Sequence, residues 1–129
     1  MIILDTHIWI WWVHGDRKLS QTAAAAIASH ESLAIDVSVI SCWEIAKLIE
    51  YNRLTLPCEI SEWFENALSY PAIQLLDLTP EIAIASTQLV NFHRDPADQI
   101  ITATAKVYDC PLVTVDTKIL GYADVTTIS

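Results

Sequence analysis

Four carboxylates stand where apolar segments of the chain end or where helices are expected to begin. They are Asp5 in ILDTH, Glu44 in SCWEIA, Asp98 in HRDPADQ and Asp116 in LVTVD. Four carboxylates gathered in one crevice repel each other, and some stay protonated unless a cation lies among them. Oxygen-only ligand sets suit Mg²⁺ or Mn²⁺ better than zinc. The set indicates metal-assisted hydrolysis of a phosphodiester, in which the metal lowers the pKa of the attacking water and screens the phosphate.

The elements that must position these carboxylates alternate between short apolar strands and helices. Strands are expected over residues 1–4, 33–35, 73–76, 112–115 and 125–128. Helices are expected over residues 8–13, 20–30, 41–51, 59–68, 79–90 and 95–108. This alternation predicts a parallel sheet covered by helices on both faces. In such an α/β fold the carboxyl ends of the strands open onto one crevice, where residues distant in sequence converge.

Each carboxylate also has a purely structural interpretation as a helix cap. Asp5 and Asp116 each follow a strand and can cap the turn that comes next. Ser41 and Glu44 have the spacing of a capping box, in which the Glu carboxylate returns to the cap amide. Residues 95–98 (DPAD) place one carboxylate at the cap and the other in the first helical turn. Because helix N-termini also favour phosphate, the cap and a catalytic site do not exclude each other.

Size and composition indicate a single globular domain over residues 1–129, since 53% of the residues are hydrophobic and only two are glycine. The apolar run 1–13 is shorter than the ~20 residues that span a bilayer and lacks a basic flank, so a cytoplasmic protein without membrane contact is expected. The three cysteines lack C-x-x-C spacing, which argues against a zinc site or a disulfide framework. The four histidines show no ligand spacing either and are expected to be packed or solvated.

The net charge of −9 counts against a nucleic-acid role, because phosphate binding normally leaves a basic surface. An acidic enzyme acting on RNA needs its seven Lys and Arg residues concentrated near the site. Arg94, directly before DPAD, is a candidate phosphate contact, with pairing to Asp95 as the alternative. Lys47 lies one turn beyond Glu44 and either lines the crevice or offsets that carboxylate. Thr6 completes the residues expected to contact substrate.

Three segments of the chain resemble the PIN-domain family, specifically the VapC-type toxins of bacterial toxin–antitoxin pairs. They are ILDTHIWIWW, SVISCWEIAKLIEYNRLTL and HRDPADQIITATAKVYDCPLVTVD. The resemblance covers essentially the whole chain, and its most specific part is the HRDP-x-D stretch with the alanine-rich helix and strand that follow. It implies a three-layer α/β/α sandwich with a central, mainly parallel sheet. One departure is Gln99, where the family usually has Arg, which removes a positive charge near the site.

The resemblance also implies that the four carboxylates are a metal-binding and catalytic quartet that cleaves RNA with Mg²⁺ or Mn²⁺, held in check by a co-expressed antitoxin. The predicted function is therefore a metal-dependent endoribonuclease. In this hypothesis Asp5 and Asp98 hold the principal ion, while Glu44 and Asp116 complete its shell or hold a second ion.

Two other functions remain open at this point. The first is a PIN fold retained for partner contacts with weak catalysis, which the charge of −9 and Gln99 favour and the intact quartet opposes. The second is a phosphatase of the haloacid-dehalogenase type, which also begins with a strand and a nucleophilic Asp. That chemistry needs a second acid where this chain has His7.

The segment IWIWWV, residues 8–13, is apolar on every side. One face of a sheet cannot cover such a helix completely in a domain this small. A homodimer is therefore expected, with Trp11 or Trp12 as its anchor, and the same surface or a groove beside it is expected to receive an antitoxin helix. The alternative is that residues 59–68 fold over the tryptophans and leave a monomer.

Overall fold

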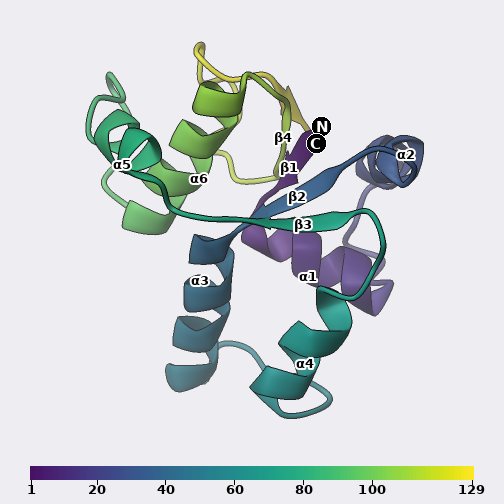
Figure 1. The fold of residues 1–129 in the computed structure, drawn as a ribbon. Coiled ribbons are helices and arrows are strands. Elements are labelled where there is room, and N and C mark those ends of the chain that lie inside the picture. The colour runs from purple at the N-terminus through teal and green to yellow at the C-terminus, as the bar shows by residue number, and fades with distance from the viewer.

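The computed structural model describes residues 1–129 as a five-stranded sheet with six helices (Figure 1). The strands are β1 (Ile2–Leu4), β2 (Ile35–Ser38), β3 (Ile73–Leu76), β4 (Leu112–Val113) and β5 (Thr127–Ile128). The helices are α1 (Thr6–His14), α2 (Gln21–His30), α3 (Val39–Glu50), α4 (Ile60–Ala67), α5 (Pro80–Ser86) and α6 (Pro96–Tyr108). The strand order is β3-β2-β1-β4-β5, and every neighbouring pair is parallel. The expected α/β fold with a mainly parallel sheet is confirmed.

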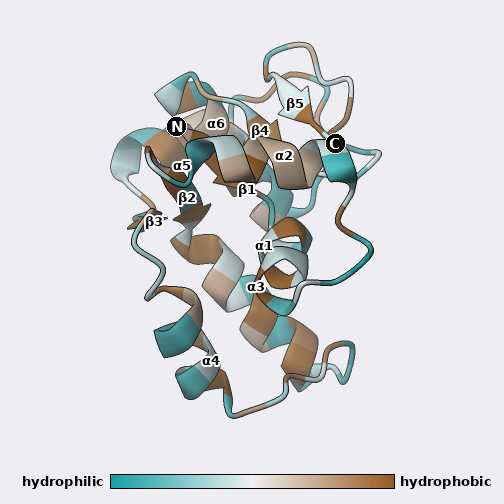
Figure 2. Ribbon diagram, turned by 90° about the vertical axis from the view of Figure 1, so that its right-hand side faces the viewer, coloured by the Kyte–Doolittle hydropathy of each residue, from teal (hydrophilic) through white to brown (hydrophobic).

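Helices cover both faces of the sheet, which makes the predicted three layers. Ile2 and Leu4 of β1 point into a larger core shared with α1, α2, α3 and α4, whereas Ile3 points into a smaller core shared with α6. Figure 1 shows α5 and α6 on the side of the sheet opposite α1 and α3, and Figure 2 shows hydrophobic colouring on the strands and along α1 and α3. None of the helices combines the length and hydrophobicity that a bilayer-crossing segment needs.

Helix α4 covers the tryptophan-rich helix α1 only in part. Trp9 is completely buried, with its ring 5.1 Å from that of Trp63 and 6.2 Å from that of Phe64. Edge-to-face and offset aromatic pairs of this kind stabilise a core beyond simple burial. Trp11 and Trp12 remain half-buried at its edge. The folding of the amphipathic segment over the tryptophans, which was the alternative to a dimer, therefore occurs for Trp9, and it leaves Trp11 and Trp12 partly accessible.

The start of α3 differs from the expected one. Helix α3 begins at Val39, and the side chain of Ser38 accepts the backbone N–H of Ile40 at 3.2 Å. The capping box predicted for Ser41 and Glu44 is therefore wrong, because Ser41 already lies inside the helix. The reason is that β2 begins two residues later than the apolar pattern indicated and extends through a buried carboxylate, which shifts the strand end and the cap together.

That carboxylate is Asp36, which is completely buried in β2 with neither oxygen hydrogen-bonded. Burial raises its pKa above the ordinary Asp range. We expect Asp36→Val to raise the free energy of unfolding at pH 7 by about 1–3 kcal/mol, because a buried polar group without a partner is unfavourable and valine suits a strand. Urea unfolding measures this change. The isosteric Asp36→Asn variant removes the charge but keeps a polar group, so its free energy of unfolding should rise by less. A valine variant less stable than the wild type would contradict the expectation.

Candidate functional site

The acidic side chains meet where the strand order reverses, between β1 and β4. In open parallel sheets this switch point leaves a crevice outside the carboxyl ends of the two strands. Asp5 follows β1 directly, and Asp116 lies shortly after β4. Glu44 comes from the first half of α3, and Asp98 comes from the first turn of α6. The crossover helices thus carry carboxylates back to the edge of the sheet at which the strands end.

A pocket of about 370 Å³, the acidic pocket, brings the four predicted carboxylates together. Asp5, Glu44, Asp98 and Asp116 all line it. A fifth acid, Asp95, lines it as well, and one oxygen from each of Glu44, Asp95 and Asp98 lies within 4.8 Å of the other two. Asp95 was expected only as a cap, and it does cap α6 by accepting the N–H of Asp98 at 3.2 Å. The Asp95 side chain therefore both caps α6 and lines the acidic pocket.

Asp5 is held in one orientation by two hydrogen bonds. Its Oδ1 accepts the backbone N–H of Thr6 at 2.8 Å, and its Oδ2 accepts the hydroxyl of Thr114 at 2.7 Å. Burial raises the pKa of Asp5, while these two bonds oppose part of the rise. The Thr114 hydroxyl also accepts the N–H of Asp116 at 3.1 Å, so it links the two strand ends. Thr114 was not predicted as a site residue; its signal in the sequence is a polar residue directly after the apolar pair that forms β4.

Asp98 lies at the electrostatic centre of the acidic pocket. Burial comes first among the causes that raise its pKa to about 8, followed by repulsion from Asp5, Asp95, Asp116 and Glu44. A carboxyl group with such a pKa is largely protonated at neutral pH unless a cation compensates its neighbours. The oxygen-only donor set and this mutual repulsion fit a hard divalent cation such as Mg²⁺ or Mn²⁺.

Thr6 and Ser41 connect the start of α1 to α3. The Thr6 hydroxyl donates to the Ser41 hydroxyl at 2.9 Å, and both side chains are completely buried. Burial raises the pKa of Glu44 on the next turn of α3, and the nearby Thr6 hydroxyl opposes part of that rise. Thr6 was expected to contact substrate, but it has no exposed surface. The structure gives it a place beneath the acidic pocket, between Asp5 and Glu44.

The cations expected near the site differ in position. Lys47 lines a second pocket of about 400 Å³ that shares Glu44 with the acidic pocket, and its Nζ lies 2.9 Å from Glu50. Arg94 is exposed, lines neither pocket and forms no ion pair with Asp95. Lys118, which the sequence analysis did not single out, lines the acidic pocket itself.

His93 contacts the central carboxylate, although it was expected to be merely packed or solvated. Its Nε2 lies 3.1 Å from Oδ2 of Asp98, and its Nδ1 accepts the backbone N–H of Asp95 at 3.3 Å. The Nε2 atom is buried and forms no hydrogen bond, so its approach to Asp98 is a close contact only. Gln99 holds this loop, since its side-chain amide donates to the carbonyl oxygen of His93 at 2.9 Å. The residue that departs from the family pattern thus positions the histidine.

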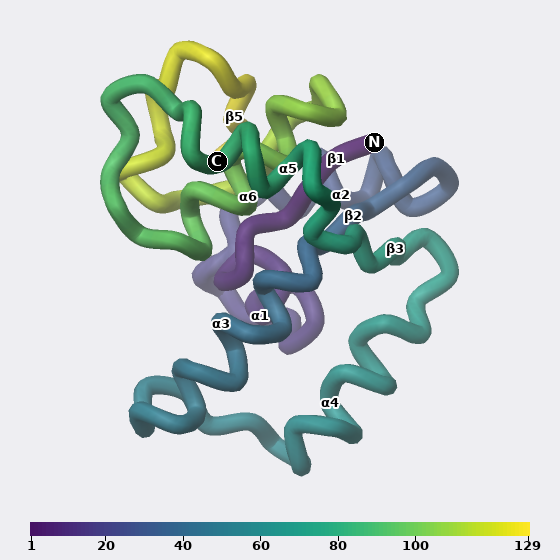
Figure 3. Tube along the Cα trace, turned by 60° about the vertical axis from the view of Figure 1, so that its left-hand side comes forward, coloured from purple at the N-terminus to yellow at the C-terminus, as the bar shows by residue number.

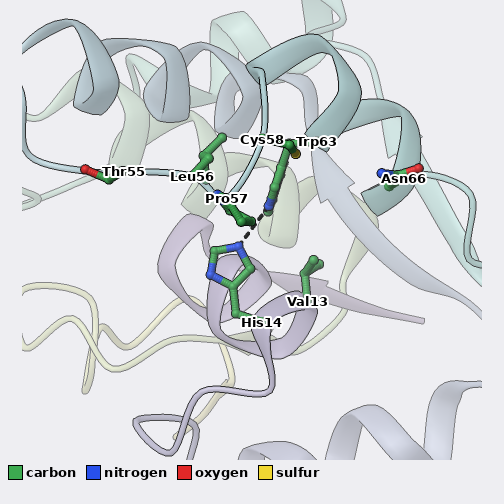
Figure 4. A pocket seen from close by; sticks show the side chains of 8 residues that line it. All are labelled: Val13, His14, Thr55, Leu56, Pro57, Cys58, Trp63 and Asn66. Carbon is green, nitrogen blue, oxygen red and sulfur yellow. Dashed lines mark hydrogen bonds between the residues drawn. The ribbon is translucent and has the colours of Figure 1, made fainter.

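The largest pocket lies elsewhere, between the end of α1 and helix α4 (Figure 4). Its volume is about 680 Å³, and its lining includes Val13, Leu56 and Cys58. The indole N–H of Trp63 donates to Nε2 of His14 across it at 2.8 Å. None of its lining residues is a carboxylate, so it offers no counterpart to the chemistry of the acidic pocket.

Comparison with known proteins identifies the family. The PIN-domain profile matches residues 2–125. The chain is 33% identical over 122 residues to Ribonuclease VapC22 of Mycobacterium tuberculosis, a match that covers 94% of this chain and 91% of that protein.

Solved structures share the fold at lower identity. The crystal structure of FitAcB from Neisseria gonorrhoeae superposes with a TM-score of 0.70 at 23% identity and covers 100% of this chain and 97% of that one. VapBC2 from Rickettsia felis, bound to a DNA fragment from its promoter, gives a TM-score of 0.69 at 16% identity over 100% of both chains. A toxin–antitoxin complex from Klebsiella pneumoniae gives 0.67 at 23%, covering 98% and 97%. The predicted family is confirmed: the chain belongs to the PIN-domain family, in its VapC-type branch.

Proposed function

We propose that the protein is a divalent-metal-dependent endoribonuclease, the toxin of a toxin–antitoxin pair, and that it hydrolyses RNA phosphodiester bonds at the acidic pocket. The observation that carries the proposal is the convergence of Asp5, Glu44, Asp98 and Asp116 at the switch point of the sheet. The 33% identity to a protein named as a ribonuclease supports the substrate class.

In this proposal the four carboxylates hold Mg²⁺ or Mn²⁺, with Asp95 near enough to take part. The bound ion would neutralise their repulsion, lower the pKa of a water molecule and screen the scissile phosphate. The chain's own groups prepare this site. Thr6 and Thr114 orient Asp5, and Nε2 of His93 lies 3.1 Å from Oδ2 of Asp98. The N-terminus of α6 favours negative charge close by.

Substrate contacts follow from the same geometry. Lys118 is proposed as a phosphate contact because it lines the acidic pocket, and Lys47 because it lines the adjoining pocket that shares Glu44. Arg94, exposed one residue before Asp95, is proposed as an outer contact for a phosphate further along the RNA. Thr6 is proposed as a positioning residue, because its buried hydroxyl reaches Ser41 and no solvent.

An antitoxin and a second copy of the chain are the proposed protein partners. The Klebsiella pneumoniae neighbour is named as a toxin–antitoxin complex, which supports an antitoxin for this chain too. The half-buried Trp11 and Trp12 leave apolar surface at the edge of α1 that suits an interface. The net charge of −9 favours a basic antitoxin segment near the acidic pocket.

The purified chain should cleave single-stranded RNA with Mg²⁺ or Mn²⁺ and lose this activity in excess chelator. Asp5→Asn should reduce the rate by about 100-fold or more, because even residues that only support a metal ligand contribute 10–100-fold. Asp16→Asn, beyond the other end of α1, is the matched control and should cleave normally. Equal cleavage with and without chelator would contradict the proposal, and a chain that binds no Mn²⁺ and cleaves nothing would support the partner-binding alternative.

A further inference from the structure

One face of α3 carries two exposed aromatic rings with a lysine between them. Trp43, Lys47 and Tyr51, here called the aromatic strip, are spaced four residues apart and therefore lie above one another along the helix. The Lys47 Nζ is 6.0 Å from the centre of the Trp43 ring and 5.6 Å from that of Tyr51. Trp43 is 47% exposed and Tyr51 is 64% exposed. Much of Trp43 and Tyr51 is therefore accessible to solvent, whereas Trp9 and Trp63 are buried in the core.

The end of α3 brings a second cation to the aromatic strip. Asn52 has a φ of 57° and reverses the chain. The backbone N–H of Arg53 donates to the carbonyl of Leu48 at 2.8 Å, and that of Asn52 donates to Ile49 at 3.0 Å. This pair of bonds is the Schellman motif, which ends a helix in a fixed geometry. As a result Arg53 lines the same 400 Å³ pocket as the aromatic strip, and it forms no ion pair.

The pocket at the aromatic strip is continuous with the acidic pocket. Glu44 and Asp95 line both, so a ligand in one extends naturally into the other. Of the seven Lys and Arg residues in the chain, Lys47 and Arg53 line the first pocket and Lys118 lines the second. Three of the seven basic residues of a chain with net charge −9 therefore line the two joined pockets. Figure 3 shows that α3 extends away from the sheet.

We propose that the aromatic strip and Arg53 form a subsite for single-stranded RNA: Trp43 and Tyr51 stack on unpaired bases, while Lys47 and Arg53 contact phosphates. Alternating rings and cations match a strand whose bases and phosphates alternate, and a duplex would hide the base faces. The Lys47–Glu50 pair is exposed and contributes little, so a phosphate readily replaces Glu50. This inference rests on the proposed function and names how the substrate is held next to the site of cleavage.

The experiment measures binding separately from cleavage. Fluorescence anisotropy of an unstructured labelled oligoribonucleotide is recorded with Mg²⁺ in the Asp98→Asn background, which removes turnover and one repelling charge. Trp43→Ala and Tyr51→Ala should each weaken binding about tenfold, and Trp43→Phe and Tyr51→Phe should restore most of the affinity. Tyr108→Ala, which removes a 41% exposed tyrosine at the far end of α6, is the matched control and should bind normally.

Two further measurements separate base stacking by the aromatic rings from phosphate binding by the cations. An abasic oligonucleotide of the same length should bind all aromatic variants equally, because it offers no bases to stack. Arg53→Ala should lower the slope of log affinity against log salt by about 0.7. Lys106→Ala should leave the slope unchanged, because Lys106 lines neither of the two pockets.

The outcomes distinguish this subsite from the proposed function. Equal affinity of the Trp43→Ala, Tyr51→Ala and Tyr108→Ala proteins overturns the subsite and is the result expected if the aromatic strip serves a protein partner. A parent protein without measurable affinity for the oligonucleotide overturns it as well. A third outcome is that binding depends on the two rings but the chain with Asp98 restored cleaves no RNA. This result overturns the nuclease function and leaves the subsite standing.

Discussion

The Asp98→Asn variant is expected to cleave no RNA and to be more stable than the wild-type chain when divalent ions are absent. Asp98 is nearly buried and is repelled by the other carboxylates of the acidic pocket, which together with burial raise its pKa to about 8. At neutral pH the ionised Asp98 is therefore less favourable in the folded protein than in the unfolded chain. An amide of the same shape removes that unfavourable term, and the free energy of unfolding should rise by about 2 kcal/mol or more in chelator.

The matched comparison is Asp95→Asn. Asp95 also contributes an oxygen to the pocket, but it is more exposed and caps α6, and asparagine caps a helix as well as aspartate does. This variant should keep measurable cleavage and gain less stability than Asp98→Asn. Initial rates with Mn²⁺ and urea unfolding in chelator measure both effects. Cleavage by Asp98→Asn at the wild-type rate would exclude Asp98 from the reaction, and an unchanged stability would exclude strong repulsion among the carboxylates.

Local signals predicted most of the fold because they were strong. Ser20, Thr79 and Asp95 cap α2, α5 and α6 as their spacing indicated, and Pro80 and Pro96 occupy the first turns. Each signal depends only on a few neighbouring residues and on backbone N–H groups that any helix leaves unpaired. The same is true of the three-layer arrangement, which follows from the alternation of apolar strands with amphipathic helices.

The errors occurred where a distant contact overrides a local pattern. Asp36 interrupts an apolar run, yet pairing with both neighbouring strands keeps it inside β2, and so the helix cap moves from Ser41 to Ser38. Ser41 then contacts Thr6, a residue 35 positions earlier in the chain. No spacing rule predicts such a contact, because it depends on how α1 and α3 pack.

In the candidate site, too, local signals predicted some residues, whereas others depend on contacts between distant parts of the chain. The four carboxylates were predicted from their places at strand ends and helix starts, and the structure brings all four into one pocket. Asp95, His93 and Thr114 were not assigned to it. Asp95 has the local signature of a cap, His93 approaches Asp98 across a turn, and Thr114 directly follows the apolar strand β4. Conversely, Arg94 and Thr6 were predicted as substrate contacts because of their neighbours in sequence. Neither lines the acidic pocket, since Arg94 lies exposed outside it and Thr6 is completely buried.

Without divalent ions the protein should lose stability as the pH rises from about 4 to about 8. The folded-state pKa values of Asp98, Asp5 and Glu44 are all raised, chiefly by burial, with repulsion among the carboxylates adding to it. The folded protein therefore holds protons that the unfolded chain has already released above its ordinary carboxylate pKa near 4. The stabilising contribution is complete below that pKa and disappears as the pH approaches the folded value, about 8 for Asp98.

Mn²⁺ should reverse this trend, because it competes with protons for the same oxygens. At a hundred times its dissociation constant a ligand of the folded state alone adds about 2.7 kcal/mol, so the melting temperature should rise steeply with Mn²⁺ at pH 8 and less at pH 5. Calorimetric titration at pH 6.5 in two buffers of different ionisation enthalpy should detect proton release, approaching one proton for Asp98 alone. The Asp36→Val variant should release the same number, because Asp36 lies outside the pocket. Mn²⁺ binding without proton release would mean that the carboxylates are already ionised, and the crowded site inferred from their burial and mutual repulsion would then be wrong.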